Sequence, residues 1–186
     1  MGLQSVCGIA LLAVCVLCSC SAVLPHAGTA AGRGDCDRAR VVLQHFLELD
    51  RTAGREWTPE LAALITDTDG PGWDRQTVVN SYHIEGCTGT GVAELTIRYE
   101  LLGHLEAEPG SGAVSFRRVV GNASERQVYR VVHTRDGMRV DGVGAIEPHI
   151  GKLRAIAQVE SLLKTSGPQG ASTAAQNVLV ALRSLP

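Results

Sequence analysis

Apolar residues recur at helical spacing in the first charged part of the chain. Asp35 or Asp37 can cap a helix whose amphipathic pattern continues to about Thr52. Its apolar face comprises Val42, Leu43, Phe46 and Leu49. Residues 58–65 then supply a capping threonine, a proline at the first helical position and an early glutamate, which predicts a short second helix over that range.

From Gln76 onward the apolar residues follow a period of two, which is the period of strands. The clearest alternation places Ala93, Leu95, Ile97, Tyr99 and Leu101 on one face. Asp136-Gly137 is a strong hairpin signal, and a two-residue turn there predicts that Arg135 lies opposite Met138. The expected strands are residues 77–84, 92–102, 113–120, 127–135 and 138–144.

The last part of the chain returns to helical spacing. Pro148 is expected to end the sheet, and two helices are predicted over residues 150–164 and 172–184. Helices before and after a run of strands predict an α+β fold, with leading helices packed on an antiparallel sheet and one or two extra C-terminal helices. The expected boundaries are a leader over 1–31 and a single domain over 32–186, with the sheet at about 76–144 and the C-terminal helices at about 149–186.

The first 31 residues differ in composition from the rest of the chain. All 17 Lys and Arg residues and all 19 Asp and Glu residues follow Ala31. An apolar run from Val6 to Leu24, followed by small residues and a proline, is typical of a secretory leader, so we expect the protein to be exported. The run is also close to the length of a membrane-spanning helix, which leaves an uncleaved anchor as an alternative.

The segment Leu17-Cys18-Ser19-Cys20 resembles the bacterial lipobox, in which a cysteine is acylated before the leader is cleaved. In this interpretation Cys20 carries the lipid, and a short tether holds the domain at a membrane surface. The alternative is cleavage after Ala27, Ala30 or Ala31, which would release the domain. The expected location is therefore the periplasm, the cell envelope or the exterior.

Two cysteines, Cys36 and Cys87, remain after the leader. An even number of cysteines in an exported chain favours a disulfide, which would join the start of the first helix to the turn after the first strand. A catalytic thiol and a metal-binding pair are the alternatives. Neither another cysteine nor a histidine at zinc-finger spacing accompanies them.

Two leading helices, a turn, long antiparallel strands and a final hairpin resemble the cone-shaped nuclear transport factor 2-like superfamily. The resemblance rests on residues 42–50 and 58–65 as helices, 92–101 as a long curved strand and 128–143 as the hairpin. Within that superfamily the chain looks most like exported or lipid-anchored bacterial members, which continue through a Pro-His step, here Pro148-His149, into a C-terminal helix. The resemblance implies a cone-like sheet curved around the first helix.

The same resemblance indicates which residues to consider for catalysis. Superfamily enzymes that isomerise or dehydrate small molecules place an aspartate or histidine base and a tyrosine donor inside the cone. By analogy, the candidate catalytic residues are Tyr99 and His133. The residues expected to approach them are Tyr82, His83, His45 and Asp50. The alternative, which we favour, is that Tyr99 is an amphipathic core residue and His133 a satisfied histidine near the end of the sheet.

Composition and missing motifs narrow the range of partners. A net charge of −2 provides no excess of Lys and Arg for neutralising the phosphates of nucleic acids. The sequence has no phosphate-binding glycine loop, nucleophile elbow or zinc-protease motif. No two of its six histidines lie three or four residues apart. We therefore expect neither a cofactor nor a metal ion.

These patterns predict an exported or lipid-anchored binding domain whose partner is a small ligand or an envelope protein. The alternatives are a small-molecule isomerase or lyase acting in a cone pocket, and a structural part of an envelope complex. Apolar and charged residues mix on the expected outer face of the sheet, which is typical of modest, wet interfaces. We expect a monomer or a weak homodimer that pairs through this face.

The lipobox interpretation predicts the effect of changing one residue in the leader. Cys20→Ser should move the protein from the membrane fraction to a soluble or unprocessed form, because the acylated sulfur is lost. Incorporation of labelled fatty acid in the producing host measures this. A wild-type protein that never takes up the label would contradict the lipobox interpretation.

Overall fold

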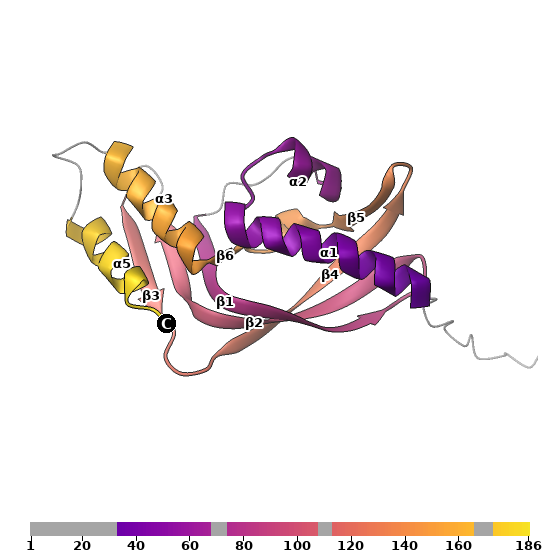
Figure 1. Ribbon diagram of the computed structural model, residues 1–186, viewed down its shortest axis with the longest axis horizontal. Helices are drawn as coiled ribbons and strands as arrows, with labels where there is room; N and C mark the ends of the chain where they lie inside the picture. The colour runs from indigo at the N-terminus through magenta and orange to yellow at the C-terminus, as the bar shows by residue number, and fades with distance from the viewer. Residues whose placement is uncertain (1–32, 68–73, 108–112, 166–172) are drawn as a thin grey trace, which may run out of the picture.

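The computed structural model describes residues 33–67, 74–107, 113–165 and 173–186. Within these ranges the chain has helices and a strongly curled sheet (Figure 1). The predicted α+β fold class is therefore confirmed. The leader with Cys20 lies outside the described residues. No helix in the described ranges is long and apolar enough to cross a membrane.

The sheet has six strands in the order β5-β4-β2-β1-β6, with β3 also paired to β2. The strands are β1 (Arg75–Thr88), β2 (Val92–Ala107), β3 (Val114–Arg118), β4 (Ser124–Thr134), β5 (Gly137–Asp141) and β6 (His149–Gly151). All pairs are antiparallel except β1 with β6, which run parallel. The sheet is therefore mixed, and not wholly antiparallel as we expected.

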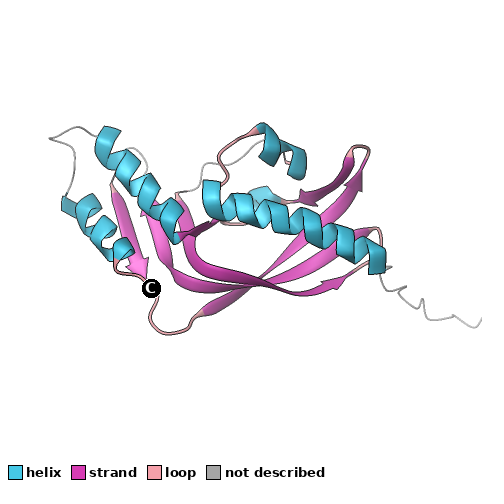
Figure 2. Ribbon diagram, in the orientation of Figure 1, coloured by secondary structure: helices cyan, strands magenta, loops and turns pink. Residues whose placement is uncertain are grey.

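Irregular pairing along β1 accompanies the curl of the sheet. The register between β1 and β2 shifts between Val78 and Val79, between Val79 and Ser81, and between Ile84 and Gly86. Such bulges bend a strand and increase its twist. Figure 2 shows the long strands β1 and β2 sweeping beneath the helices.

The first helix, α1 (Arg33–Ala53), lies along the concave side of this sheet (Figure 1). Its inward residues are Ala39, Leu43, Phe46, Leu47 and Asp50, all at most 2% exposed. The ring of Phe46 lies 5.8 Å from that of Tyr129 on β4. The helical spacing of apolar residues in the sequence therefore corresponds to the face that packs on the strands.

The second helix, α2 (Pro59–Leu64), begins as its sequence predicts. Thr58 is extended, and its hydroxyl accepts a hydrogen bond from the backbone N–H of Leu61 at 3.1 Å. Ile65, expected to end the helix, is instead extended and bridges to Val140 of β5 in parallel. This bridge covers the outer edge of β5 at Val140.

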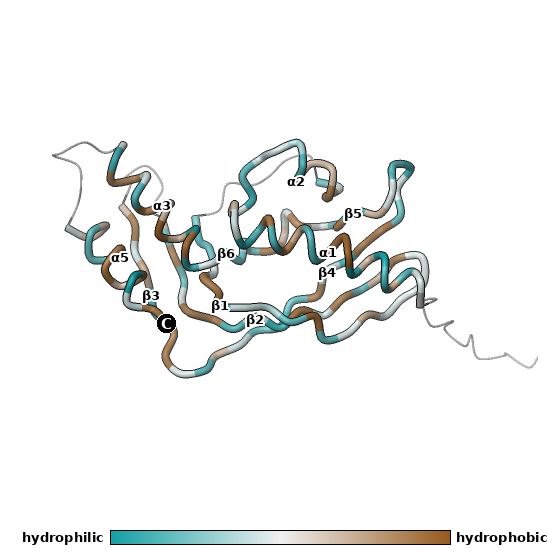
Figure 3. Tube along the Cα trace, viewed as in Figure 1, coloured by the Kyte–Doolittle hydropathy of each residue, from teal (hydrophilic) through white to brown (hydrophobic). Residues whose placement is uncertain are grey.

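Buried apolar side chains form two hydrophobic cores along the molecule. Figure 3 shows the hydropathy of the residues along the chain. The first joins α1 and α2 to the concave side of β1, β2, β4 and β5, and includes Val143 of the short 3-10 helix η1 (Val143–Ala145). The second joins α3 (Lys152–Thr165) and α5 (Thr173–Arg183) to β3 and to the end of β2. Gly103 allows β2 and β3 to pack closely, because a Cβ there would lie 2.5 Å from the Phe116 ring.

Pro148 does not end the sheet, contrary to the sequence-based expectation. Its carbonyl accepts a hydrogen bond from the Thr77 N–H at 2.9 Å, and the next three residues pair with residues 77–79 of β1. A proline is compatible with this position, because it precedes the strand and its missing N–H is not needed there. Ile150, expected on a helix, is a fully buried strand residue, and the sheet therefore extends beyond the predicted limit near residue 144.

The β4–β5 hairpin forms, but its register differs from the predicted one. Thr134 lies opposite Gly137, so each β4 residue pairs two positions earlier along β5 than expected. The turn again has two residues but lies at Arg135 and Asp136, one position earlier than predicted, and the Thr134 hydroxyl donates to the Gly137 carbonyl across it at 2.8 Å. Because side chains alternate with a period of two, a two-residue shift leaves every side chain on its predicted face. Arg130 and Asp141 become direct partners, with a 3.2 Å ion pair.

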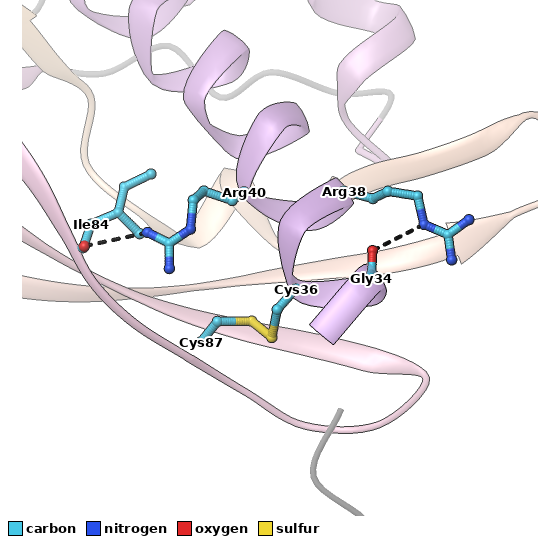
Figure 4. Close-up of a disulfide and its surroundings, with 6 residues drawn as sticks. All are labelled: Gly34, Cys36, Arg38, Arg40, Ile84 and Cys87. Carbon is cyan, nitrogen blue, oxygen red and sulfur yellow. Dashed lines mark hydrogen bonds between the residues drawn. A yellow bond between two sulfur atoms is a disulfide. The ribbon is translucent and has the colours of Figure 1, made fainter. Parts of the chain in front are cut away.

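A disulfide joins Cys36 near the start of α1 to Cys87 near the end of β1 (Figure 4). The two cysteines are separated by 51 residues in sequence. The bridge fixes the first turns of α1 to the sheet at the end of the molecule opposite α3 and α5 (Figure 1).

Removing this bridge should destabilise the fold measurably. Closing a loop of 51 residues is worth roughly 3 to 4 kcal/mol in the chain-entropy account, so Cys36→Ser with Cys87→Ser should lower the free energy of unfolding by about that amount. Urea unfolding of the double variant and of reduced wild type should give similar losses. Two free thiols in folded, oxidised wild type would contradict the bridge.

Candidate functional site

The interior of the curled sheet contains a pair of tyrosines. Tyr99 on β2 and Tyr129 on β4 are at most 1% exposed, and their hydroxyls hydrogen-bond at 2.9 Å. Burial raises the pKa of both phenols well above the usual value for tyrosine. Both groups are therefore neutral at physiological pH, and each uses the other as its hydrogen-bond partner.

A buried ion pair lies at the end of α1. The Arg55 guanidinium donates to both carboxylate oxygens of Asp50, at 2.9 and 3.1 Å. The Asp50 side chain is 1% exposed and that of Arg55 is 10% exposed. Arg55 also donates to the backbone carbonyls of Val143, Ile146 and Glu147. The pair thereby ties the end of α1 to the segment that leads into β6.

His149 connects this ion pair to the tyrosines and to the surface. Its backbone N–H donates to Asp50 at 3.2 Å, and its ring stacks on Tyr99 at 3.8 Å between centroids. Its Nε2 is hydrogen-bonded to Glu125 of β4, and its Nδ1 is buried without a partner. The hydrogen bond from His149 lowers the pKa of the Glu125 carboxyl, against the opposing effect of burial.

Further polar residues surround His149 where β1, β2 and β6 meet. The Thr77 hydroxyl donates to Glu147 at 2.8 Å and lies 3.2 Å from Nδ1 of His104, while Arg75 donates to Glu147 at 2.8 Å. We call these groups the β6 cluster, which comprises Arg75, Thr77, His104, Glu125, Glu147 and His149. The cluster can hold or move a proton between Glu125 and His149.

The structure does not bring together the two candidate catalytic residues. Tyr99 lies inside the sheet opposite Glu125, whereas His133 lies eight residues further along β4, roughly 26 Å away at the rise of a strand. His133 points to the same face as Tyr129, but its side chain is 49% exposed and 3.9 Å from Asp35. It lies beside the turn of the β4–β5 hairpin, beyond the buried interior.

The four residues expected near Tyr99 divide into two groups. Tyr82 lies 6.4 Å from Tyr99 between ring centroids, and Asp50 belongs to the buried ion pair beside the tyrosines. His83 is exposed on β1, and His45 is exposed and bonded to Glu60 at 2.8 Å. The structure therefore places Tyr82 and Asp50 near Tyr99, but not His45 or His83.

Sequence reasoning missed Arg55 and most of the β6 cluster. Arg55 has a backbone φ of 60°, a conformation that residues other than glycine rarely adopt, and no sequence pattern marks it. In the sequence, His149 is marked only by the Pro148-His149 step of the superfamily resemblance. Among the described residues, no three His, Cys, Asp or Glu side chains are grouped so that they could hold a metal ion.

A groove of about 380 Å³ lies on the surface beside the end of β6. Its lining includes Asn80 of β1 together with Arg51, Lys152 and Arg154, and Leu153 lies among these cations. The side chain of Leu153 is 81% exposed. Arg51 also forms an ion pair with Glu48, and Arg154 forms one with Glu56. The groove therefore combines ion-paired cations with an exposed apolar residue.

In comparisons with known proteins, no family model, no curated protein and no solved structure matches this chain.

The ion pair at the end of α1 should dominate the local stability. Asp50→Ala leaves the Arg55 guanidinium buried without its carboxylate, which typically costs about 3 to 5 kcal/mol. Glu48→Ala on the same helix breaks an exposed pair with Arg51 and should cost less than about 1 kcal/mol. Urea unfolding of both variants measures this difference. Equal losses would show that the buried pair has no special role.

Proposed function

We propose that this protein is an exported or lipid-anchored interaction domain that binds through its outer surface. The observation that carries the proposal is the filling of the concave side of the sheet by the protein's own side chains. Tyr99, Tyr129 and Phe46 are among the largest fully buried side chains, and they contact one another or α1. A substrate would have to displace this packed interior.

We also propose that the fold is cone-like in the manner of the nuclear transport factor 2-like superfamily. The strong curl of the sheet, the long strands β1 and β2, and α1 along the concave side support this assignment. Export is supported by the disulfide, because such bridges persist in oxidising compartments. The lipobox segment supports an anchor at Cys20.

The groove beside β6 is the surface that we propose for binding. Protein–protein interfaces typically combine an apolar centre with a polar, hydrated rim and are enriched in arginine. Leu153 provides an exposed apolar residue, and Arg51, Lys152 and Arg154 surround it. Ion pairs and the contact of Lys152 with the Leu185 carbonyl restrain these cations, which lowers the entropy lost when a partner binds.

The β6 cluster favours one alternative function. It brings two histidines and two carboxylates together around Thr77, and Glu125 is 38% exposed, so a proton could reach solvent there. A small-molecule isomerase or lyase could use Glu125 and His149 as an acid–base pair. Turnover that is lost in Glu125→Gln while the fold is retained would favour this enzyme over the interaction domain.

Binding through the groove predicts opposite outcomes for two exposed apolar residues. In the native host, Leu153→Asp should reduce cross-linking of the tagged full-length chain to its envelope partner several-fold, because the apolar centre of the interface becomes charged. Val180→Asp is the matched control, because Val180 on α5 is 67% exposed and does not line the groove. Both variants should keep the wild-type melting temperature. Cross-linking that survives Leu153→Asp unchanged would rule out the groove as the binding surface.

A further inference from the structure

Most of the outer edge of β1 has no neighbouring strand. β6 pairs only with residues 77–79, although β1 continues to Thr88. Residues 77 and 79 are almost fully buried where β6 covers them, whereas no residue from 80 to 88 is buried. In the described part of the chain, no strand covers this nine-residue edge.

The main-chain groups of this edge can be placed from one side-chain contact. The Arg40 guanidinium donates to the Ile84 carbonyl at 3.4 Å, so this carbonyl is directed away from β2 (Figure 4). Alternate residues of a strand direct their N–H and C=O groups to the same side, so those of Tyr82 also face the open edge. Such a row of donors and acceptors matches another extended backbone.

We propose that a second copy of this chain occupies the edge, with the two β1 strands pairing antiparallel about Ile84. A two-fold axis allows one strand to serve both partners, because the same surface is used on each side. Ile84 would exchange both of its main-chain hydrogen bonds with Ile84 of the second copy. The two sheets would then form one continuous sheet, and neither β1 edge would remain open.

Charge selects this register over its neighbours. Pairing about Ile84 places His83 opposite Glu85 of the second copy, and Glu85 opposite the other His83. A shift that centres the pairing on His83 would instead place the two histidines together, and one centred on Glu85 would oppose two carboxylates. Glu85 is held on the same face by Arg98 and Arg126, at 2.9 and 2.7 Å. An imidazole can hydrogen-bond to a carboxylate directly across a strand pair, whereas two carboxylates placed there repel each other.

The same register covers apolar surface. Tyr82 and Ile84 are only partly buried against the first core, so an added strand would cover more of their apolar surface.

Arg40 competes with the second copy for the edge. Its long hydrogen bond to the Ile84 carbonyl satisfies in the monomer an acceptor that the dimer needs. Arg38, two residues nearer the start of α1, instead bonds to Gly34 (Figure 4) and to Asp35. It therefore provides a matched control that leaves the edge untouched.

The test is the oligomeric state of the full-length chain and its variants from micromolar to millimolar concentration, by light scattering and sedimentation. His83→Glu should weaken the dimer about tenfold, because each new carboxylate faces Glu85 of the other copy. Within its own chain the new glutamate lies opposite Arg98, so the fold should be retained. His83→Lys should preserve the dimer, Arg40→Ala should tighten it several-fold, and Arg38→Ala should leave it unchanged.

Hydrogen exchange locates the contact independently of these variants. The amides of Tyr82 and Ile84 should gain protection as the protein concentration rises. A monomer at every concentration overturns the proposal, as does a dimer in which these amides stay unprotected or the variants at 83 and 40 have no effect. Because the inference does not rest on the groove, Leu153→Asp should leave the dimer unchanged whether or not the groove binds a partner.

Discussion

The buried ion pair between Asp50 and Arg55 is the interaction that organises this molecule. Asp50 uses one carboxylate to bind the Arg55 guanidinium and the backbone N–H of His149. Arg55 in turn binds three carbonyls of the segment between β5 and β6. Burying two charges is unfavourable unless their hydrogen bonds are satisfied, and these contacts largely meet that requirement. They also support the unusual backbone conformation of Arg55, and they fix β6 relative to α1.

The placement of β6 determines how the two cores are joined. His149 faces the first core, where it stacks on Tyr99, and Ile150 belongs to the second core with α3 and α5. Three residues therefore couple the curled sheet to the C-terminal helices. The stacking of His149 on Tyr99 also helps to fill the interior that a substrate would need. The same anchoring thus favours stability over an open pocket.

The sequence pattern was informative where local periodicity determines structure. The alternation around Tyr99 correctly placed that residue inside the sheet, and Asp136-Gly137 correctly marked a hairpin. Periodicity shows which face of the sheet a side chain is on, but not how far along the strand it lies. His133 was therefore placed on the correct face, although it lies at the exposed end of β4. β6 was missed because three residues show no period, and Ile150 fits the helical spacing that follows. Its strand conformation depends on pairing with residues 77–79, which are distant in sequence.

The shortness of β6 explains the position of the two surfaces that we propose for binding. α3 begins at Lys152, immediately after the third residue of β6, so the backbone leaves the sheet and β1 continues alone from Asn80. The groove lies where the chain leaves the sheet, and its lining includes Asn80, Lys152 and Arg154. That departure also exposes the β1 edge. A longer β6 would fill the groove and pair with the β1 edge, whereas the three-residue strand is sufficient to join the two cores. The geometry that anchors the C-terminal helices therefore also leaves main-chain groups and an apolar residue available for other molecules.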